Sequence, residues 1–254
     1  MFSLRRLVIL AVLTTSASLG IQAQSSSSTP QPDQTTAQAP APSPATQSSM
    51  SVQARIKARR EARRVAAIDD VYSHLYEVYV GTGYLRFLPG DGAVPGKGLQ
   101  HLNEYSWNVG VTRYFNQKLG VTIDGRGTYG SAYIGPNAVS NSAIVKPAIS
   151  QYGAMIGPTY RFVLHPRYSI SGRVLAGAEY GNFSRDLRPF TPASLGLYSD
   201  GTAVAISASV PIEYNVSPKV GIRVAPEYLL TNFGGSIQNN RGVTGGIVVR
   251  WGKQ

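Results

Sequence analysis

Apolar and polar residues alternate along most of the chain after residue 75, and a period of two is the pattern of a β-strand with one buried face. In residues 168–180, Ile170, Val174 and Tyr180 share one parity, and Arg173 and Glu179 fall on the other. Eight runs of this kind occur, at residues 76–87, 105–115, 119–133, 150–164, 168–182, 202–216, 219–231 and 241–251. Each run is long enough for a tilted membrane strand, which needs about 9–11 residues.

The connections between these runs alternate in length. Three are tight, at residues 116–118, 165–167 and 217–219, and four are long and rich in Gly, Pro, Asn and Ser, at about 88–104, 134–149, 183–201 and 232–240. Short turns at one rim, long loops at the other and both chain ends on the short-turn side are typical of an outer-membrane barrel. The sequence therefore predicts an all-β fold for residues 73–254, an eight-stranded antiparallel up-and-down transmembrane barrel.

Alternation alone does not say whether the apolar face meets lipid or a soluble core, and a periplasmic lipocalin-like ligand-binding barrel is the alternative. Two observations favour the membrane. No lysine falls inside a strand body, and aromatic residues gather toward the strand ends, as in the interfacial belts of membrane proteins. The belts are predicted to contain Tyr105, Trp107, Tyr129, Tyr160, Phe162, Tyr168, Tyr180, Tyr214, Tyr228 and Trp251.

The polar parity carries as many cations as anions. These are Arg126, Arg161, Arg173, Arg223 and Arg250 against Glu77, Asp124, Glu179, Glu213 and Glu227. A buried charge without a partner costs several kcal/mol, so equal numbers predict a paired network in the lumen. Eight strands enclose only enough space for side chains, which predicts a filled interior rather than a diffusion pore. A gated path for small ions is the alternative.

Three prolines, Pro158, Pro211 and Pro226, fall within predicted strands. A closed barrel has no free edge on which a residue without an N–H group is tolerated. We therefore expect bulges or local breaks at these positions.

The chain before the barrel divides into three segments. Residues 1–23 have the Arg5-Arg6 pair, a short apolar core and a cleavage site after Ala23, which predicts a signal peptide. Residues 24–50, rich in Ser, Pro and Gln, predict a disordered linker. Residues 51–72 predict a basic helix, which is either a solvated helix or a binder of peptidoglycan or anionic headgroups. Its cations are Arg55, Lys57, Arg59, Arg60, Arg63 and Arg64.

The formal net charge of +11 does not indicate a nucleic-acid partner. Without the signal peptide, the linker and the basic segment, 16 cations and 11 anions leave +5 for residues 65–254, spread out rather than in a stripe. The chain has no cysteine, and its three histidines (His74, His101, His165) are far apart in sequence. We therefore expect no metal, no cofactor and no thiol chemistry.

Residues 222–235, 238–240 and 246–253 resemble the closing hairpin of the small outer-membrane barrel family, the group around the OmpA transmembrane domain, OmpX and the opacity proteins. The resemblance implies a place in the outer membrane of a Gram-negative-type bacterium, with outer-membrane lipids as partners. It also implies insertion by the outer-membrane assembly machinery, which reads an aromatic residue at the end of the last strand. Trp251 would be that residue, although Gly252, Lys253 and Gln254 follow it where family members end on the aromatic.

Some proteins that the chain resembles modify lipids, and three residues of this chain are candidates for such chemistry. His101, Glu104 and Ser106 lie together at the first long loop and could supply a base, an orienting group and a nucleophile. Their spacing does not match the His-x-Ser arrangement of lipid A deacylase barrels. The sequence therefore predicts no enzyme but a structural or adhesive surface role.

Overall fold

The computed structural model describes residues 51–93, 98–134 and 145–254. The predicted signal peptide and linker, residues 1–23 and 24–50, lie outside these ranges. Helix α1 (Val52–Tyr72) begins at Ser51, whose side-chain oxygen accepts a hydrogen bond from the Ala54 amide at 3.2 Å. No helix in the described ranges is both long and apolar enough to cross a membrane.

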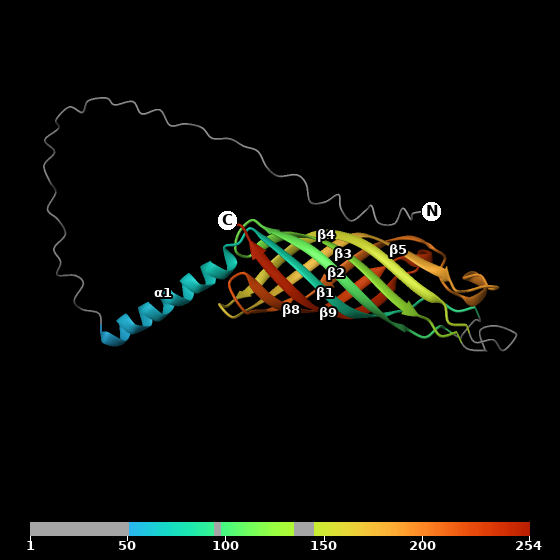
Figure 1. The fold of residues 1–254 in the computed structure, drawn as a ribbon, viewed down its shortest axis with the longest axis horizontal. Coiled ribbons are helices and arrows are strands. Elements are labelled where there is room, and N and C mark those ends of the chain that lie inside the picture. Colours follow the sequence, from blue (N-terminus) through green and yellow to red (C-terminus); the bar gives the residue numbers. More distant parts are fainter. Residues whose placement is uncertain (1–50, 94–97, 135–144) are drawn as a thin grey trace, which may run out of the picture. The chain divides into compact units, whose positions relative to one another are not determined.

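The rest of the described chain is almost entirely β-structure (Figure 1). Its elements are β1 (Tyr76–Phe87), β2 (Leu102–Tyr114), β3 (Leu119–Ser131), β4 (Ala148–Leu164), β5 (Tyr168–Arg185), η3 (Ala193–Leu195), β6 (Gly201–Ser209), β7 (Ile212–Asn215), β8 (Val220–Thr231), η4 (Phe233–Gly235) and β9 (Gln238–Trp251).

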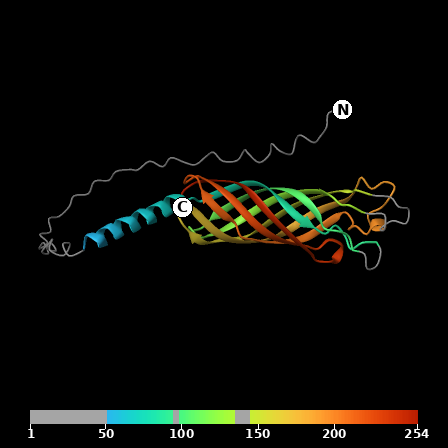
Figure 2. The ribbon, with the colours of Figure 1, turned by 90° about the horizontal axis from the view of Figure 1, so that it is seen from below.

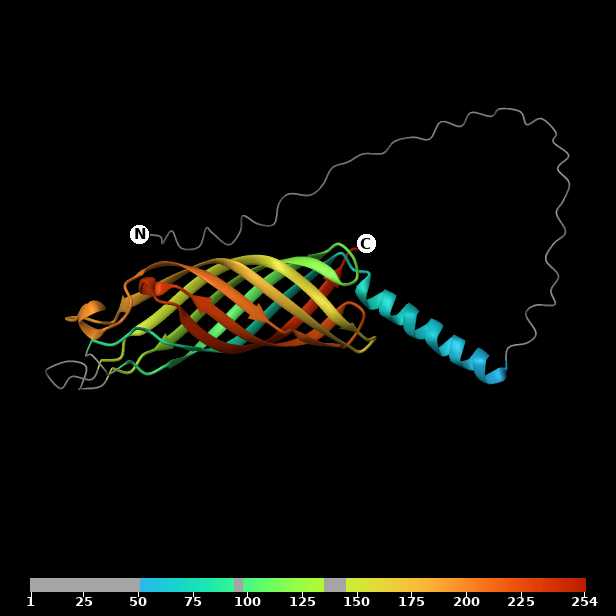
Figure 3. The same cartoon turned by 180° about the vertical axis from the view of Figure 1, so that it is seen from behind.

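These strands form a closed ring. All pairings are antiparallel, and β9 pairs with β1, so that Glu77 lies opposite Arg250. Strands β6 and β7 together hold one place between β5 and β8. Figures 1 and 3 show the two sides of this ring, with every strand tilted. The predicted eight-membered, up-and-down barrel is confirmed.

Several strand ends differ from the prediction. β2 begins at Leu102 rather than at residue 105, and β5 extends to Arg185 rather than to residue 182. The alternation of buried and exposed residues continues through these extra residues, although turn-forming residues nearby suggested loops. The difference matters for Glu104, which belongs to a strand and not to the first long loop.

The prolines act as expected at two positions of three. Pro211 separates β6 from β7, and the β4–β5 pairing skips Gly157 and Pro158. The expectation is wrong for Pro226, which stays within β8 and pairs with Val243. Its carbonyl accepts from Val210 at 3.1 Å, so its backbone faces the break at residues 210–211, and one interruption accommodates two prolines.

The polarity of the barrel is inverted relative to a soluble protein. Val174 and Val224 are 53% and 48% exposed on the outside, whereas Arg173 and Arg223 are 3% and 6% exposed and point inward. A soluble lipocalin-like barrel would expose its polar parity and bury its apolar one. In a bilayer the exposed apolar face contacts hydrocarbon, and the closed ring leaves no unpaired strand edge.

The long loops gather at one end of the barrel (Figure 2). A cluster of buried apolar side chains lies at this end. Phe183 is its centre and contacts Phe233, Tyr198 and Phe87, with ring centroids 5.2, 5.9 and 6.1 Å away. The loops themselves are joined, because the Tyr198 amide donates to the Pro89 carbonyl at 3.1 Å. These contacts cover the outer end of the lumen with hydrophobic side chains.

The inverted polarity predicts a depth-dependent cost for a charge on the outside. Val224 lies on β8 between Ile222, which faces Tyr214 of the inner aromatic belt, and Tyr228 of the outer belt. Val224→Arg should lower the free energy of unfolding from lipid vesicles by about 2–4 kcal/mol. The same change at Val216, in the turn after β7, should cost about 0–1 kcal/mol. Equal costs at the two depths would contradict this assignment.

Candidate functional site

The lower part of the lumen, near the short turns, holds an ion cluster that joins opposite walls of the barrel. The Glu77 carboxylate on β1 accepts hydrogen bonds from Arg161 of β4 at 2.7 Å and from Arg250 of β9 at 3.0 Å, and it also pairs with Arg223 of β8. Glu213 on β7 accepts from Arg223 at 2.5 Å and pairs with Arg250. Three guanidinium groups thus share two carboxylates.

A second cluster lies higher in the lumen. Arg126 of β3 donates to Asp124 on its own strand at 3.1 Å and reaches across to Glu227 of β8 at 2.7 Å. Arg173 of β5 donates to the Tyr79 hydroxyl of β1 at 2.7 Å and to Ser209 of β6 at 3.1 Å. An ion pair between Arg173 and Asp124 at 3.8 Å joins the two sets, so side chains from five strands are connected across the barrel.

Aromatic rings complete both clusters. The Arg161 guanidinium lies 3.6 Å from the centroid of the Tyr114 ring, and Arg223 lies 4.5 Å from that of Tyr79. Such contacts stabilise a desolvated cation. Gly110 makes room for Tyr79, because a Cβ atom at Gly110 would lie 2.2 Å from the tyrosine ring.

The upper lumen departs from the predicted one-to-one pairing. Glu179 is 1% exposed, and neither of its carboxylate oxygens has a hydrogen-bond partner among the described residues. Glu104 was predicted to lie in a loop and to be a candidate catalytic residue. It is fully buried, and its carboxylate accepts hydrogen bonds from Gln151 at 2.9 and 3.0 Å. The described lumen therefore holds six acidic groups against five arginines, and Glu104 was missed because β2 was expected to begin three residues later.

The last turn of α1 closes the inner end of the lumen. Tyr72 is fully buried, and its hydroxyl donates to the His165 carbonyl and accepts from Asn215, both at 2.8 Å. Its ring faces Arg161 at 5.0 Å. Burial raises the pKa of the Tyr72 phenol above its usual value, so the group stays a neutral donor. Nothing in the local sequence pattern singled out this residue, because its partners come from two distant turns.

Other contacts hold α1 against the rim of short turns. Gln117 donates to Asp69 at 2.8 Å, and the Gln254 amide donates to the Ser73 carbonyl at 2.8 Å. The six cations predicted to bind an anionic surface lie in the exposed part of the helix, and among the described residues only Arg64 forms an ion pair, with Glu61 at 3.8 Å. They are Arg55, Lys57, Arg59, Arg60, Arg63 and Arg64.

The structure places every aromatic residue of the predicted belts on the outside of the barrel, with exposed fractions between 37% for Tyr228 and 78% for Tyr105. Tyr129 packs edge-on against Tyr152 in the outer belt, and Tyr160 packs against Phe162 in the inner belt. Aromatic rings at these two levels suit the two interfaces of a bilayer.

The candidate catalytic residues are not assembled. His101 is exposed, whereas Glu104 points into the lumen toward Gln151. Within the described part of the chain, no hydrogen bond joins His101, Glu104 and Ser106, and no three acidic or histidine side chains are placed to hold a metal ion.

Neither a protein-family model nor a curated protein matches the chain. Solved structures do match it. Ail, the attachment invasion locus protein of Yersinia pestis, in complex with the heparin analogue sucrose octasulfate, has 16% identity over 68% of this chain and 98% of that chain, with a TM-score of 0.40. Neisserial surface protein A has 13% identity over 69% and 97%, with a TM-score of 0.46. The E. coli Outer Membrane Protein W has 13% identity over 70% and 98%, with a TM-score of 0.37.

The architecture defines the class of protein. The ring of strands is closed, the outside is apolar between two aromatic levels, the lumen is polar, and long loops occur at one end only. This combination is that of an integral outer-membrane β-barrel, and the chain is one. The class agrees with the resemblance noted for residues 222–253.

The two buried glutamates predict opposite responses to the same substitution. Glu77→Gln removes half of the negative charge that neutralises three arginines, and breaking such buried pairs costs about 3–5 kcal/mol. Glu179→Gln removes a carboxylate that has no described partner and should leave the free energy of unfolding unchanged or increase it. Urea titration of the two variants in lipid vesicles measures the difference. Equal losses would show that the ion pairs do not stabilise the barrel.

Proposed function

We propose that this chain is a closed, non-conducting outer-membrane barrel with a structural or adhesive role at the cell surface. The observation that carries the proposal is the filled lumen, which Tyr72 covers at the inner end and the apolar loop cluster covers at the outer end. A cavity among Asn108, Arg126 and Thr128 has a volume of about 10 Å³, hardly enough for one water molecule. Such an interior serves stability rather than transport.

The outer loops support a role in surface contact. The Asp200 carboxylate accepts from the amides of Phe183 and Ser184 at 2.6 and 3.0 Å, which holds the last residues of β5 against the end of the β5–β6 loop. The Gly92 amide donates to the Gly196 carbonyl at 3.1 Å and connects this loop to the β1–β2 loop. Because these loops are already packed against one another, they lose little conformational entropy when a partner binds.

The basic helix supports a second contact on the periplasmic side. Its last turn is held to the short-turn rim, so its cations are kept near the inner face of the membrane. Peptidoglycan carboxylates or anionic headgroups are the partners that this charge favours. The proposal includes no catalysis, since His101, Glu104 and Ser106 do not form a site.

The closed lumen predicts that the protein conducts no ions across a membrane. The purified protein in a planar bilayer should give no regular conductance steps. Tyr72→Ala should also be silent, because the Arg161–Tyr114 stack and the Glu77 cluster still fill the lumen below the apolar cap. Reproducible unit steps from the unmodified protein would show a continuous aqueous path and contradict the proposal.

The helix predicts a salt-dependent attraction to anionic material. Arg59→Gln combined with Arg60→Gln should reduce co-sedimentation with anionic vesicles or with peptidoglycan at low salt, and the difference should shrink as salt screens the charges. Arg185→Gln combined with Arg188→Gln removes the same charge from the opposite end of the barrel and is the matched control. If both double variants sediment like the unmodified protein, the helix does not bind these surfaces.

A further inference from the structure

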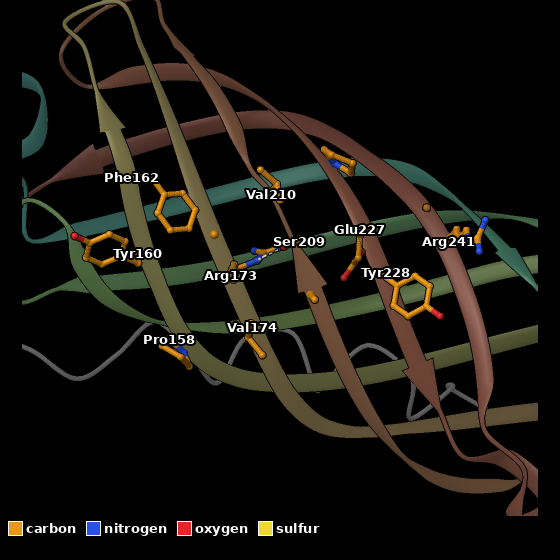
Figure 4. Close-up of a pocket in the computed structure, with 14 residues that line it drawn as sticks. Pro158, Tyr160, Phe162, Arg173, Val174, Ser209, Val210, Glu227, Tyr228 and Arg241 are labelled. Atoms are coloured by element: carbon orange, nitrogen blue, oxygen red, sulfur yellow. Dashed lines mark hydrogen bonds between the residues drawn. The ribbon is translucent and has the colours of Figure 1, made fainter.

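A groove of about 700 Å³ runs across the outside of the barrel over β4, β5, β6, β8 and β9 (Figure 4). Tyr160 and Phe162 stand at its inner end and Tyr228 at its outer end. Small residues form its floor, chiefly Gly172 and Ala208, where larger side chains would fill the space. The strands that form this floor are the ones that contain or adjoin Pro158, Pro211 and Pro226.

The strand register shows where the groove leads. Val174 lies opposite Ala208, Ala208 opposite Tyr228, and Tyr228 opposite Arg241. These outward-facing residues form one row across β5, β6, β8 and β9, which spans roughly 14 Å at the usual spacing between strands. An apolar channel thus ends beside an exposed guanidinium group.

The same row continues onto β1, where Arg86 lies directly opposite Arg241. Like charges in directly opposed positions destabilise a strand pair. Neither arginine forms an ion pair with a described residue, and the undescribed loop residues 94–97 and 135–144 contain no Asp or Glu. With His101 and Asn239, the two arginines line a polar pocket of about 360 Å³. This pocket has the charge and the donors for an anion.

The position of the pocket indicates which anion. Tyr228 of the outer aromatic belt lies directly opposite Arg241, and its hydroxyl donates to Asn239 at 2.7 Å. Tyr84 precedes Arg86 by two residues on the same outward face of β1. The pocket is therefore at the level of lipid headgroups on the long-loop side of the membrane. Phosphate is an anion found at that level, and a pair of guanidinium groups suits its oxygens.

We propose that this surface binds one phosphorylated lipid of the outer leaflet, with its phosphate between Arg86 and Arg241 and one acyl chain along the groove over Ala208. The inference rests on the proposed membrane insertion, and it adds a defined headgroup and a defined path for the chain. A free phosphate ion would use the pocket but not the groove, which separates the two sources of the same chemistry.

The test measures lipid binding to the full chain in detergent micelles by native mass spectrometry. The probes are diphosphorylated lipid A and the same lipid without its phosphates. Arg86→Gln combined with Arg241→Gln should weaken binding of the phosphorylated lipid by at least about tenfold, as expected for lost hydrogen bonds to a charged group. Ala208→Trp, which fills the groove without changing charge, should also weaken it.

The control is Arg113→Gln, an exposed arginine on β2 near the opposite rim, which should bind the lipid like the unmodified protein. Equal binding of the two lipid forms would overturn the proposal, as would full competition by inorganic phosphate together with an unaffected Ala208→Trp variant. Each variant is first checked for folding on a gel, where an unboiled folded barrel migrates differently from the same protein after boiling. Loss of that behaviour in the unmodified protein would instead refute membrane insertion itself.

Discussion

The structure depends on one constraint. A closed ring of strands with an apolar outside must place its charged side chains in a lumen only a few side chains wide, where most of them have to pair with one another. Arginines answer this constraint because a planar guanidinium group can bind two carboxylates and still stack on a tyrosine. Arg223 does this by pairing with Glu77 and Glu213 while its guanidinium group lies 4.5 Å from the centroid of the Tyr79 ring. The ion network is therefore a consequence of the inverted polarity.

Both ends of the lumen are closed by different chemistry, and each closure is connected to a surface that can meet a partner. At the inner end Tyr72 belongs to the basic helix, so the residue that closes the lumen also holds the exposed cations near the membrane. At the outer end Phe183 and Phe233 pack the long loops over the lumen. Both closures thus rest on the same filled interior.

Much of the fold could be predicted from the sequence, because a period of two determines which face each side chain occupies. The parity of residues such as Arg173 and Val174 was sufficient to place them. The partners across the lumen could not be predicted, since Arg161 and Glu77 are 84 positions apart and meet only after the ring closes. Glu104 was missed because the start of β2 resembles a loop, and Tyr72 because a helix outside the barrel supplies it.

The central claim is that hydrocarbon surrounds the outward parity of the strands. The chain has no cysteine, so single cysteines carrying a nitroxide label can be placed at Ile123, Val174 and Val204, which are 59%, 53% and 63% exposed, and at Ile237 between β8 and β9 as a water-facing reference. In lipid vesicles the account predicts that dissolved oxygen reaches the three strand labels far better than a water-soluble nickel complex does, with the reverse at Ile237. Nickel access at the strand positions equal to that at Ile237 would contradict it.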